Sequence, residues 1–144
     1  GQVIARYRKM FPFLPYEQGV TAGSEFVVFD VPRIGRFGVS ICYDMWFPET
    51  TRTLAWMGAE VVIHPTMTNT IDRDLELAIA RTNAAVNQSW FGDVKCAGRL
   101  GNGRSPVVAP GGSAVVSIAV RSVEMRPASG LCLPVAMTSV ARRS

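Results

Sequence analysis

The sequence predicts an α/β fold, because strand-like and helix-like segments alternate along its first two thirds. Apolar runs typical of buried strands cover Phe37–Ile41, Ala59–His64 and Ser89–Val94. Helix signals follow the first two of these runs, at Pro48–Met57 and Asp72–Gln88. A strand–helix–strand–helix–strand order is typical of βαβ units, whose sheet is at least partly parallel. Such sheets carry their chemistry at the carboxyl ends of the strands.

The segment before Phe37 is expected to hold two strands and a long loop. Val3–Tyr7 alternates apolar and polar residues, which predicts a strand. Residues 10–24 are rich in proline and glycine and predict an ordered loop. Phe26–Val31 predicts a second strand, and Arg33–Arg36 its turn into the strand before Cys42.

The sequence contains signals for the ends of the two predicted helices. Pro48 suits the first helical position, and Glu49 suits the positive end of the helix dipole. Gly58 is a natural residue just past the carboxyl end. The second helix is the clearer one, with an acidic start and with Leu75, Ile79, Thr82 and Val86 recurring at helical spacing.

The pattern weakens towards the carboxyl terminus. Residues 113–120 are strand-like, whereas residues 121–144 lack clear periodicity. We therefore divide the chain into one domain over residues 1–112 and a divergent tail over residues 113–144.

Composition excludes several classes of protein. With 48% hydrophobic and 18% charged residues, the 144-residue chain can build a core. Its apolar runs have the length of strands, so we expect no membrane span and no membrane partner. The last 50 residues carry seven basic and one acidic side chain, a charge of +6, whereas the first 94 residues carry −2, so that the net charge is +4. Their arginines are scattered without interleaved aromatics, which argues against a nucleic-acid partner.

The cysteines point to a reducing compartment. Cys42, Cys96 and Cys132 form no CxxC pair and no metal-ligand spacing, so we expect a cytoplasmic protein without a metal. Only Cys42 falls where chemistry is expected, on the tight turn between a strand and the helix beginning at Pro48. Backbone N–H groups there can favour a thiolate and later an oxyanion.

Lys9 is a candidate partner for that thiol. An isolated Arg–Lys pair is normally a solvated surface feature. Here the apolar neighbours Met10, Phe11 and Phe13 favour a lysine held in a pocket, where its ammonium can stabilise an oxyanion.

Three segments carry a family resemblance. Tyr7-Arg8-Lys9, followed by Pro12, Pro15 and Glu17, resembles the lysine motif of the nitrilase superfamily of carbon–nitrogen hydrolases. The run Cys42–Glu49 is similar to its cysteine motif, and Gly101–Ser105 resembles its later glycine-rich turn. The lysine segment is nearest in form to the amidase and formamidase branch. The resemblance implies that the chain forms the carboxyl-terminal portion of an α-β-β-α sandwich.

The resemblance also implies roles for individual residues. Cys42 is the expected nucleophile, Lys9 with the Tyr43 N–H the expected oxyanion site, and Glu17 an additional active-site glutamate. The general base of the family is a glutamate upstream of the lysine motif. Because the chain begins at Gly1 rather than at Met, we expect that the amino-terminal part is missing and that this chain alone is inactive.

The implied reaction is hydrolysis of a small aliphatic amide through a cysteine thioester, with release of ammonia and with no cofactor. We assign Phe13, Tyr43, Trp46 and Thr66 to substrate binding, and we expect a homo-oligomer in the full-length form. Alternatives are an N-carbamoyl amide hydrolase, a nitrilase, or a truncated chain without activity. The carbamoyl-acid enzymes tend to place arginines just after the cysteine, where this chain has Asp44 and Met45.

Two further features have plainer interpretations. His64, the only histidine, suggests a Cys–His dyad, but a polar residue that caps a strand accounts for it as well. Gly101–Ser105 lacks the lysine and the following helix of a phosphate loop, so we interpret it as a turn.

Overall fold

The protein is built on one six-stranded sheet with helices on one side. The structure, a computed structural model, describes residues 2–14, 16–68, 72–98 and 101–119. The sheet has the order β1-β2-β3-β4-β7-β8. Its strands are β1 (Val28–Val31), β2 (Gly35–Val39), β3 (Val61–Thr66), β4 (Trp90–Lys95), β7 (Arg104–Val108) and β8 (Ala114–Ala119). The three central strands β2, β3 and β4 are parallel and the outer pairs are antiparallel, so the α/β prediction is confirmed.

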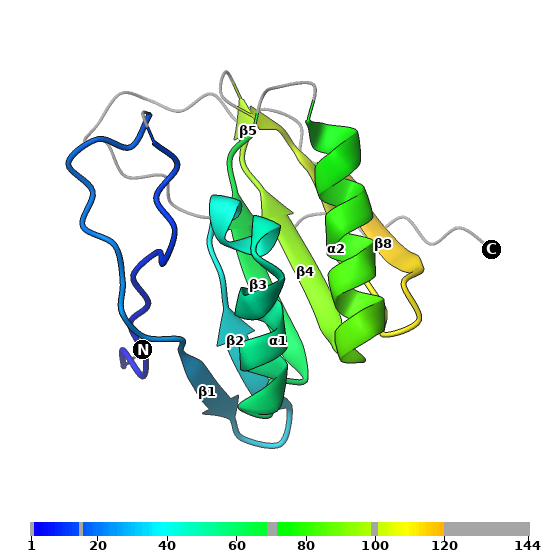
Figure 1. Cartoon of the computed structure of the whole chain (residues 1–144). Coiled ribbons are helices and arrows are strands. Elements are labelled where there is room, and N and C mark those ends of the chain that lie inside the picture. The colour runs from blue at the N-terminus through cyan, green and yellow to red at the C-terminus, as the bar shows by residue number, and fades with distance from the viewer. Residues whose placement is uncertain (1, 15, 69–71, 99–100, 120–144) are drawn as a thin grey trace.

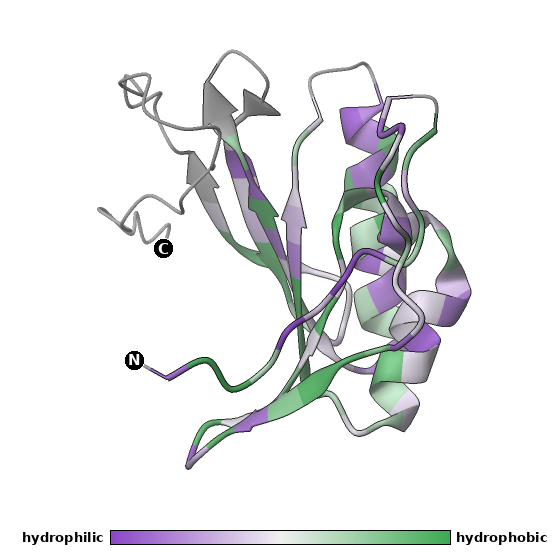
Figure 2. Ribbon diagram, turned by 90° about the vertical axis from the view of Figure 1, so that its left-hand side faces the viewer, coloured by the Kyte–Doolittle hydropathy of each residue, from purple (hydrophilic) through white to green (hydrophobic). Residues whose placement is uncertain are grey.

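Two helices and a short 3-10 turn cover one face of this sheet. They are η1 (Cys42–Trp46), α1 (Pro48–Trp56) and α2 (Arg73–Asn87), and Figures 1 and 2 show them together on the same side. Helix α1 begins at Pro48, and Gly58 adopts a φ of +89° just beyond its end, as the sequence predicts. No helix among the described residues is both long and apolar enough to cross a membrane.

A compact core lies between the helices and the sheet. Eight buried apolar side chains form it: Met45, Leu54, Ala59, Val62, Ala80, Ala84, Phe91 and Val108. Gly38 lets α1 approach β2 closely, because a Cβ at this position would lie 3.1–3.2 Å from atoms of Leu54 and Ala59. Burial of this core is the main force that fixes α1 and α2 on the sheet.

Helix α2 turns a partly polar face towards the core. Its buried residues are Arg73, Glu76, Ala80, Asn83 and Ala84. Of the residues whose spacing predicts the helix, Ile79 packs against the core, whereas Leu75 and Val86 are 51% and 52% exposed. The prediction of the helix is confirmed, but its apolar periodicity does not mark the side that packs.

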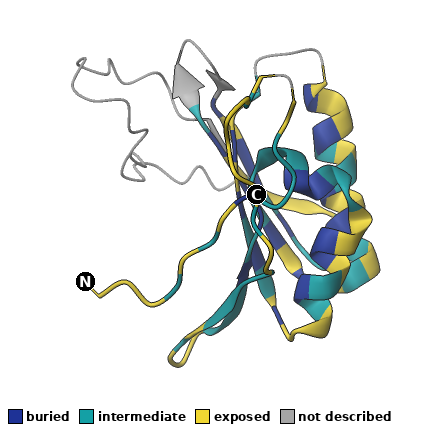
Figure 3. Cartoon of the chain, turned by 60° about the vertical axis from the view of Figure 1, so that its left-hand side comes forward, coloured by how far each residue is buried: buried dark blue, intermediate teal, exposed yellow. Residues whose placement is uncertain are grey.

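The opposite face of the sheet is open among the described residues. Trp90 and Val94 of β4 are 40% and 48% exposed. No described helix lies on this side of the sheet (Figure 3). The described part therefore has one helix layer and one sheet layer.

Two segments differ from their prediction. Val3–Tyr7 is not a strand, since it pairs with no described strand. Within Gly101–Ser105, Gly101–Asn102 forms strand β6, which pairs with β5 (Ala97–Gly98), and β7 begins at Arg104. Only Gly103, with a φ of +65°, is a bend between the two strands.

The carboxyl-terminal expectations are tested only in part. The strand predicted over residues 113–120 is present as β8, which closes the sheet beside β7. The aperiodic segment 121–144 lies outside the described residues. The division of the chain at residue 112 stays a prediction.

Candidate active site

Cys42 occupies the predicted turn at the carboxyl end of β2. It is the first residue of η1 and adopts a left-handed conformation with a φ of +50°. Residues other than glycine rarely adopt this conformation, and its strain is typical of functional turns. The sequence predicts a strand-to-helix turn, and the structure adds one 3-10 turn before α1 begins at Pro48.

Lys9 is buried and paired with Glu17. The lysine is 7% exposed, and its Nζ lies 2.5 Å from Glu17 Oε2. The same carboxylate oxygen accepts a hydrogen bond from the Phe13 N–H at 2.5 Å. Burial opposes ionisation of Glu17, but the hydrogen bonds from Lys9 and Phe13 outweigh it and lower the pKa of Glu17 below its ordinary value. The structure thus brings together two of the three predicted catalytic residues.

Asp44 is a residue that the sequence analysis did not assign to the site. Its side chain is fully buried, and it joins the lysine loop to the cysteine turn. Oδ1 accepts the Phe11 N–H at 2.8 Å, and Oδ2 accepts the Tyr7 hydroxyl at 2.7 Å and the Ile41 N–H at 2.8 Å. Burial of Tyr7, its hydrogen bond to Asp44 and the negative charge of Asp44 together raise the pKa of Tyr7. The one local signal is that Asp44 stands three residues after Ile41, from where a carboxylate can cap a helical turn.

The aromatic residues predicted to bind substrate lie together beside Cys42. The Phe13 and Tyr43 rings are 4.8 Å apart between centroids, and Tyr43 and Trp46 are 6.2 Å apart. Phe13 is 42% exposed, and Tyr43 and Trp46 are half-buried. Aromatic side chains at a partly open site supply apolar contact area for a small ligand.

Thr66 ends β3, the parallel neighbour of β2, and therefore lies at the same edge of the sheet as Cys42. It is 5% exposed, and its Oγ1 has no hydrogen-bond partner among the described residues. Its hydroxyl is therefore free to bond a polar atom at this edge of the sheet, but Thr50, Thr51 and Ser89 have buried hydroxyls without a partner too.

His64 is a buried polar residue within a strand and does not cap one. It lies within β3, is fully buried, and its Nδ1 is 2.7 Å from Ser40 Oγ. Burial lowers the pKa of His64 to about 3, assisted by the positive charges of Arg73, Lys9 and Lys95. The interpretation as a strand cap is thus wrong, because β3 continues to Thr66. Its hydrogen bond to Ser40 gives no support to a dyad with Cys42.

A second feature outside the sequence analysis is a buried ion network between α2 and β4. Arg73 Nη1 lies 2.7 Å from Asp93 Oδ2 and 3.1 Å from Glu76 Oε2, and Lys95 Nζ lies 3.3 Å from the same Glu76 oxygen. All four side chains are at most 4% exposed. Burial raises the pKa of Asp93 and lowers that of Lys95. The network joins α2 to the end of β4.

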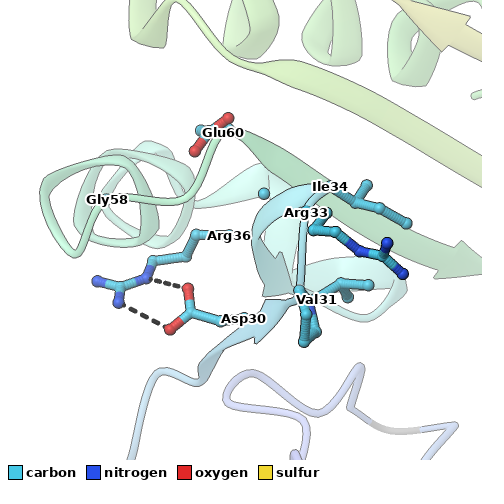
Figure 4. A pocket seen from close by; sticks show the side chains of 9 residues that line it. Asp30, Val31, Arg33, Ile34, Arg36, Gly58 and Glu60 are labelled. Carbon is cyan, nitrogen blue, oxygen red and sulfur yellow. Dashed lines mark hydrogen bonds and ion pairs between the residues drawn. The ribbon is translucent and has the colours of Figure 1, made fainter.

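One surface hollow lies away from this site. It has a volume of about 520 Å³ and surrounds the β1–β2 turn, at the amino end of β2, whereas Cys42 follows the carboxyl end. Figure 4 shows one pair of its charges joined, with Arg36 bound to Asp30 at 2.8 and 2.9 Å. We therefore do not assign a ligand to it. Within the described part of the chain, no group of three or more His, Cys, Asp or Glu side chains is placed to hold a metal ion.

Comparison with known proteins gives consistent matches. A profile of the family described as carbon–nitrogen hydrolase matches residues 1–124. The chain is 32% identical over 98 residues to a formamidase of Photorhabdus laumondii and 33% identical over 98 residues to a formamidase of Bacillus cereus. Each alignment covers 68% of this chain but only 29% and 30% of those proteins, respectively.

Solved structures match the fold. An amidase from Nesterenkonia sp. superposes with a TM-score of 0.76 at 25% identity, and Nit3 of Saccharomyces cerevisiae, a member of the nitrilase superfamily, with 0.72 at 32% identity. A variant of the amidase from Nesterenkonia sp. AN1 (TM-score 0.77, 25% identity) carries the acetamide moiety of fluoroacetamide covalently on its active-site cysteine. Each match covers 83% of this chain and between 45% and 48% of the other, so the chain spans about half the length of these structures.

Proposed function

Since this chain belongs to the carbon–nitrogen hydrolase family, we propose that its full-length form is a thiol hydrolase that cleaves the C–N bond of a small aliphatic amide. The observation that supports the proposal is the left-handed turn at Cys42, to which Asp44 ties the loop that carries the buried Lys9–Glu17 pair. A nucleophile on a strained turn with a buried ammonium nearby is suited to acyl transfer.

The proposed reaction begins with attack of the Cys42 Sγ on the carbonyl carbon of the amide. The Lys9 ammonium and the Tyr43 N–H stabilise the negative oxygen of the tetrahedral intermediate. Protonation of the leaving nitrogen releases ammonia and leaves a thioester on Cys42. Water then attacks the thioester, which frees the carboxylic acid and returns the thiol.

The two residues found at the positions after Tyr43, namely Asp44 and Met45, favour a neutral substrate over one that carries a carboxylate. Asp44 uses both carboxylate oxygens for internal hydrogen bonds, and Met45 is 1% exposed in the core. Neither can hold a substrate carboxylate, as an N-carbamoyl acid would need. The matches to formamidases and to an amidase that takes an acetamide moiety on its cysteine support the same choice.

The general base is proposed to be a glutamate upstream of the lysine motif, as the family resemblance implies. Glu17 is engaged by Lys9 and the Phe13 N–H. We therefore assign Glu17 the part of orienting Lys9 and the substrate nitrogen. His64, uncharged and bound to Ser40, is not a candidate. We further propose that the full-length protein is a homo-oligomer.

Ammonia release from formamide, acetamide and butyramide tests the proposal. The full-length protein is expected to hydrolyse at least one of them, and Cys42→Ala to abolish the activity. The 144-residue chain alone is expected to be inactive, because loss of a general base typically costs about 10²–10⁴-fold. Turnover by the 144-residue chain at ordinary enzyme rates would show that the base lies within it. An active Cys42→Ala variant would refute the thiol mechanism.

A further inference from the structure

The carboxylate of Asp44 joins two segments that are far apart in the sequence. Tyr7 and Phe11 belong to the amino-terminal loop, whereas Ile41 and Asp44 belong to the cysteine turn. All three hydrogen bonds are donated to Asp44 and are 2.7–2.8 Å long. A fully buried carboxylate with these donors is rigidly held, because moving any of them leaves a buried polar group unsatisfied.

These contacts bracket the two proposed catalytic residues. Tyr7 and Phe11 each stand two residues from Lys9, on either side of it. On the other segment, Ile41 stands one residue before Cys42 and Asp44 two residues after it. The hydrogen bonds therefore tie the Tyr7 side chain and the Phe11 backbone, on either side of Lys9, to the turn that carries Cys42.

Other contacts between the loop and the turn are apolar. The Phe11 and Phe47 rings stack at 3.8 Å between centroids, and Phe13 lies against Tyr43 at 4.8 Å. Ring contacts of this kind bring surfaces together but tolerate sliding, whereas hydrogen bonds to one carboxylate set a single register. Asp44 is thus the polar group that fixes where the loop lies on the turn.

We propose that Asp44 is a positioning residue, whose three hydrogen bonds set the place of the Lys9 ammonium relative to the Cys42 thiol. The proposal rests on the roles proposed above for Lys9 and Cys42. It assigns Asp44 no contact with substrate. Its prediction is specific: Asp44 affects the thiol through Lys9, and the effect vanishes when Lys9 has no charge.

Alkylation of Cys42 by iodoacetamide at pH 7, followed by peptide mapping, measures this coupling without any substrate. Lys9→Met is expected to slow alkylation roughly tenfold, because it removes the positive charge that is proposed to lie beside the sulfur. Asp44→Asn is expected to slow it by a similar factor, since an amide cannot accept at both positions. In the double variant, Asp44→Asn is expected to add nothing to Lys9→Met.

Matched variants separate positioning from folding. Tyr7→Phe removes one of the three hydrogen bonds and is expected to slow alkylation by a smaller factor, even if Asp44→Asn does not fold. Tyr16→Phe, at an 82% exposed tyrosine of the same loop, and Asp30→Asn, at an exposed carboxylate near the β1–β2 turn, are expected to have no effect. The alkylation rate of Cys96 in each sample reports loss of folding.

The outcomes are distinguishable. If Lys9→Met slows alkylation while Tyr7→Phe and a folded Asp44→Asn do not, Asp44 does not position Lys9. If Asp44→Asn slows alkylation equally with and without Lys9, its effect is general to the fold and the inference is overturned. If Lys9→Met itself changes nothing, the role of Lys9 in the proposed function fails, and the inference fails with it. Absence of amide hydrolysis alone would count only against the proposed substrate.

Discussion

Among single residues, the cysteines differ most in their surroundings. Cys42 lies on a left-handed turn at the carboxyl end of β2, whereas Cys96 follows β4 and donates its backbone N–H to Thr66 O at 2.9 Å. We predict that iodoacetamide modifies Cys42 faster than Cys96 or Cys132 at pH 7, because cysteine reactivity follows thiolate character and exposure. Mass mapping of the folded protein measures the three rates. Equal or faster modification of the other two cysteines would contradict the prediction.

His64 predicts a pH dependence of stability. Its pKa is about 3 in the folded protein against an ordinary value of 6.5, so between these values the unfolded chain binds a proton that the folded protein excludes. The contribution of uncharged His64 to stability is therefore complete above pH 6.5 and is lost as the pH falls towards 3. In this range the equilibrium constant for unfolding rises about tenfold per pH unit.

Urea denaturation of the purified protein at pH 7, 6 and 5 measures this effect. His64→Gln is expected to have a lower stability at pH 7 and a shallower pH dependence than the unmodified protein. Because carboxylates titrate mostly below this range, the difference in slope isolates the histidine. Parallel slopes for the two proteins would show that another group carries the dependence.

The residue scale also shows where sequence reasoning stops. Cys42 and Lys9 could be proposed as catalytic residues because each lies in a segment whose local pattern is informative, and their roles stay predictions. Asp44 could not, because two of its three donors lie more than 30 residues away in the chain. For His64, the local sequence suggests the end of a strand, whereas burial depends on its packing against Phe91 and on the bond to Ser40.

Among the elements, α2 and β4 are joined by the buried network of Arg73, Glu76, Asp93 and Lys95. Arg73 contacts both acidic partners, so its removal leaves buried carboxylates with less compensation. We predict that Arg73→Met lowers the free energy of unfolding by about 3 kcal/mol, as is typical when one partner of a buried ion pair is removed. Arg52→Met, at an exposed position on α1, is expected to have little effect in the same urea titration. Equal costs for the two variants would show that the network contributes nothing specific.

The elements were predictable where local signals dominate. The proline and glycine at the ends of α1 and the apolar runs of β3 and β4 act within a few residues, and the structure confirms them. Val3–Tyr7 has a strand-like pattern but lacks a neighbour, and a strand requires one. Helix α2 buries Arg73 and Glu76 because the ion network neutralises their charges. Hydrophobic periodicity does not predict the burial of paired charges.

For the whole molecule, the open side of the sheet is the dominant feature. The residues of β4 alternate, so that Phe91 faces the helices while Trp90 and Val94 face away from them and are half-exposed. A sheet with apolar residues on both faces is normally covered on both. The solved relatives are about twice as long as the part that this chain matches, so their remaining half is the expected cover.

We predict that the 144-residue chain by itself associates, because exposed apolar sheet surface favours contact with another copy. Size-exclusion chromatography is expected to show oligomers or aggregates. Val94→Lys, which places a charge on the open face, is expected to reduce the association. Leu75→Lys is the matched control, because Leu75 has a similar exposed fraction but lies on α2, on the other side of the sheet. If Leu75→Lys dissolves the oligomers and Val94→Lys does not, the helices form the contact; a stable monomer of the unmodified chain would mean that the sheet needs no cover.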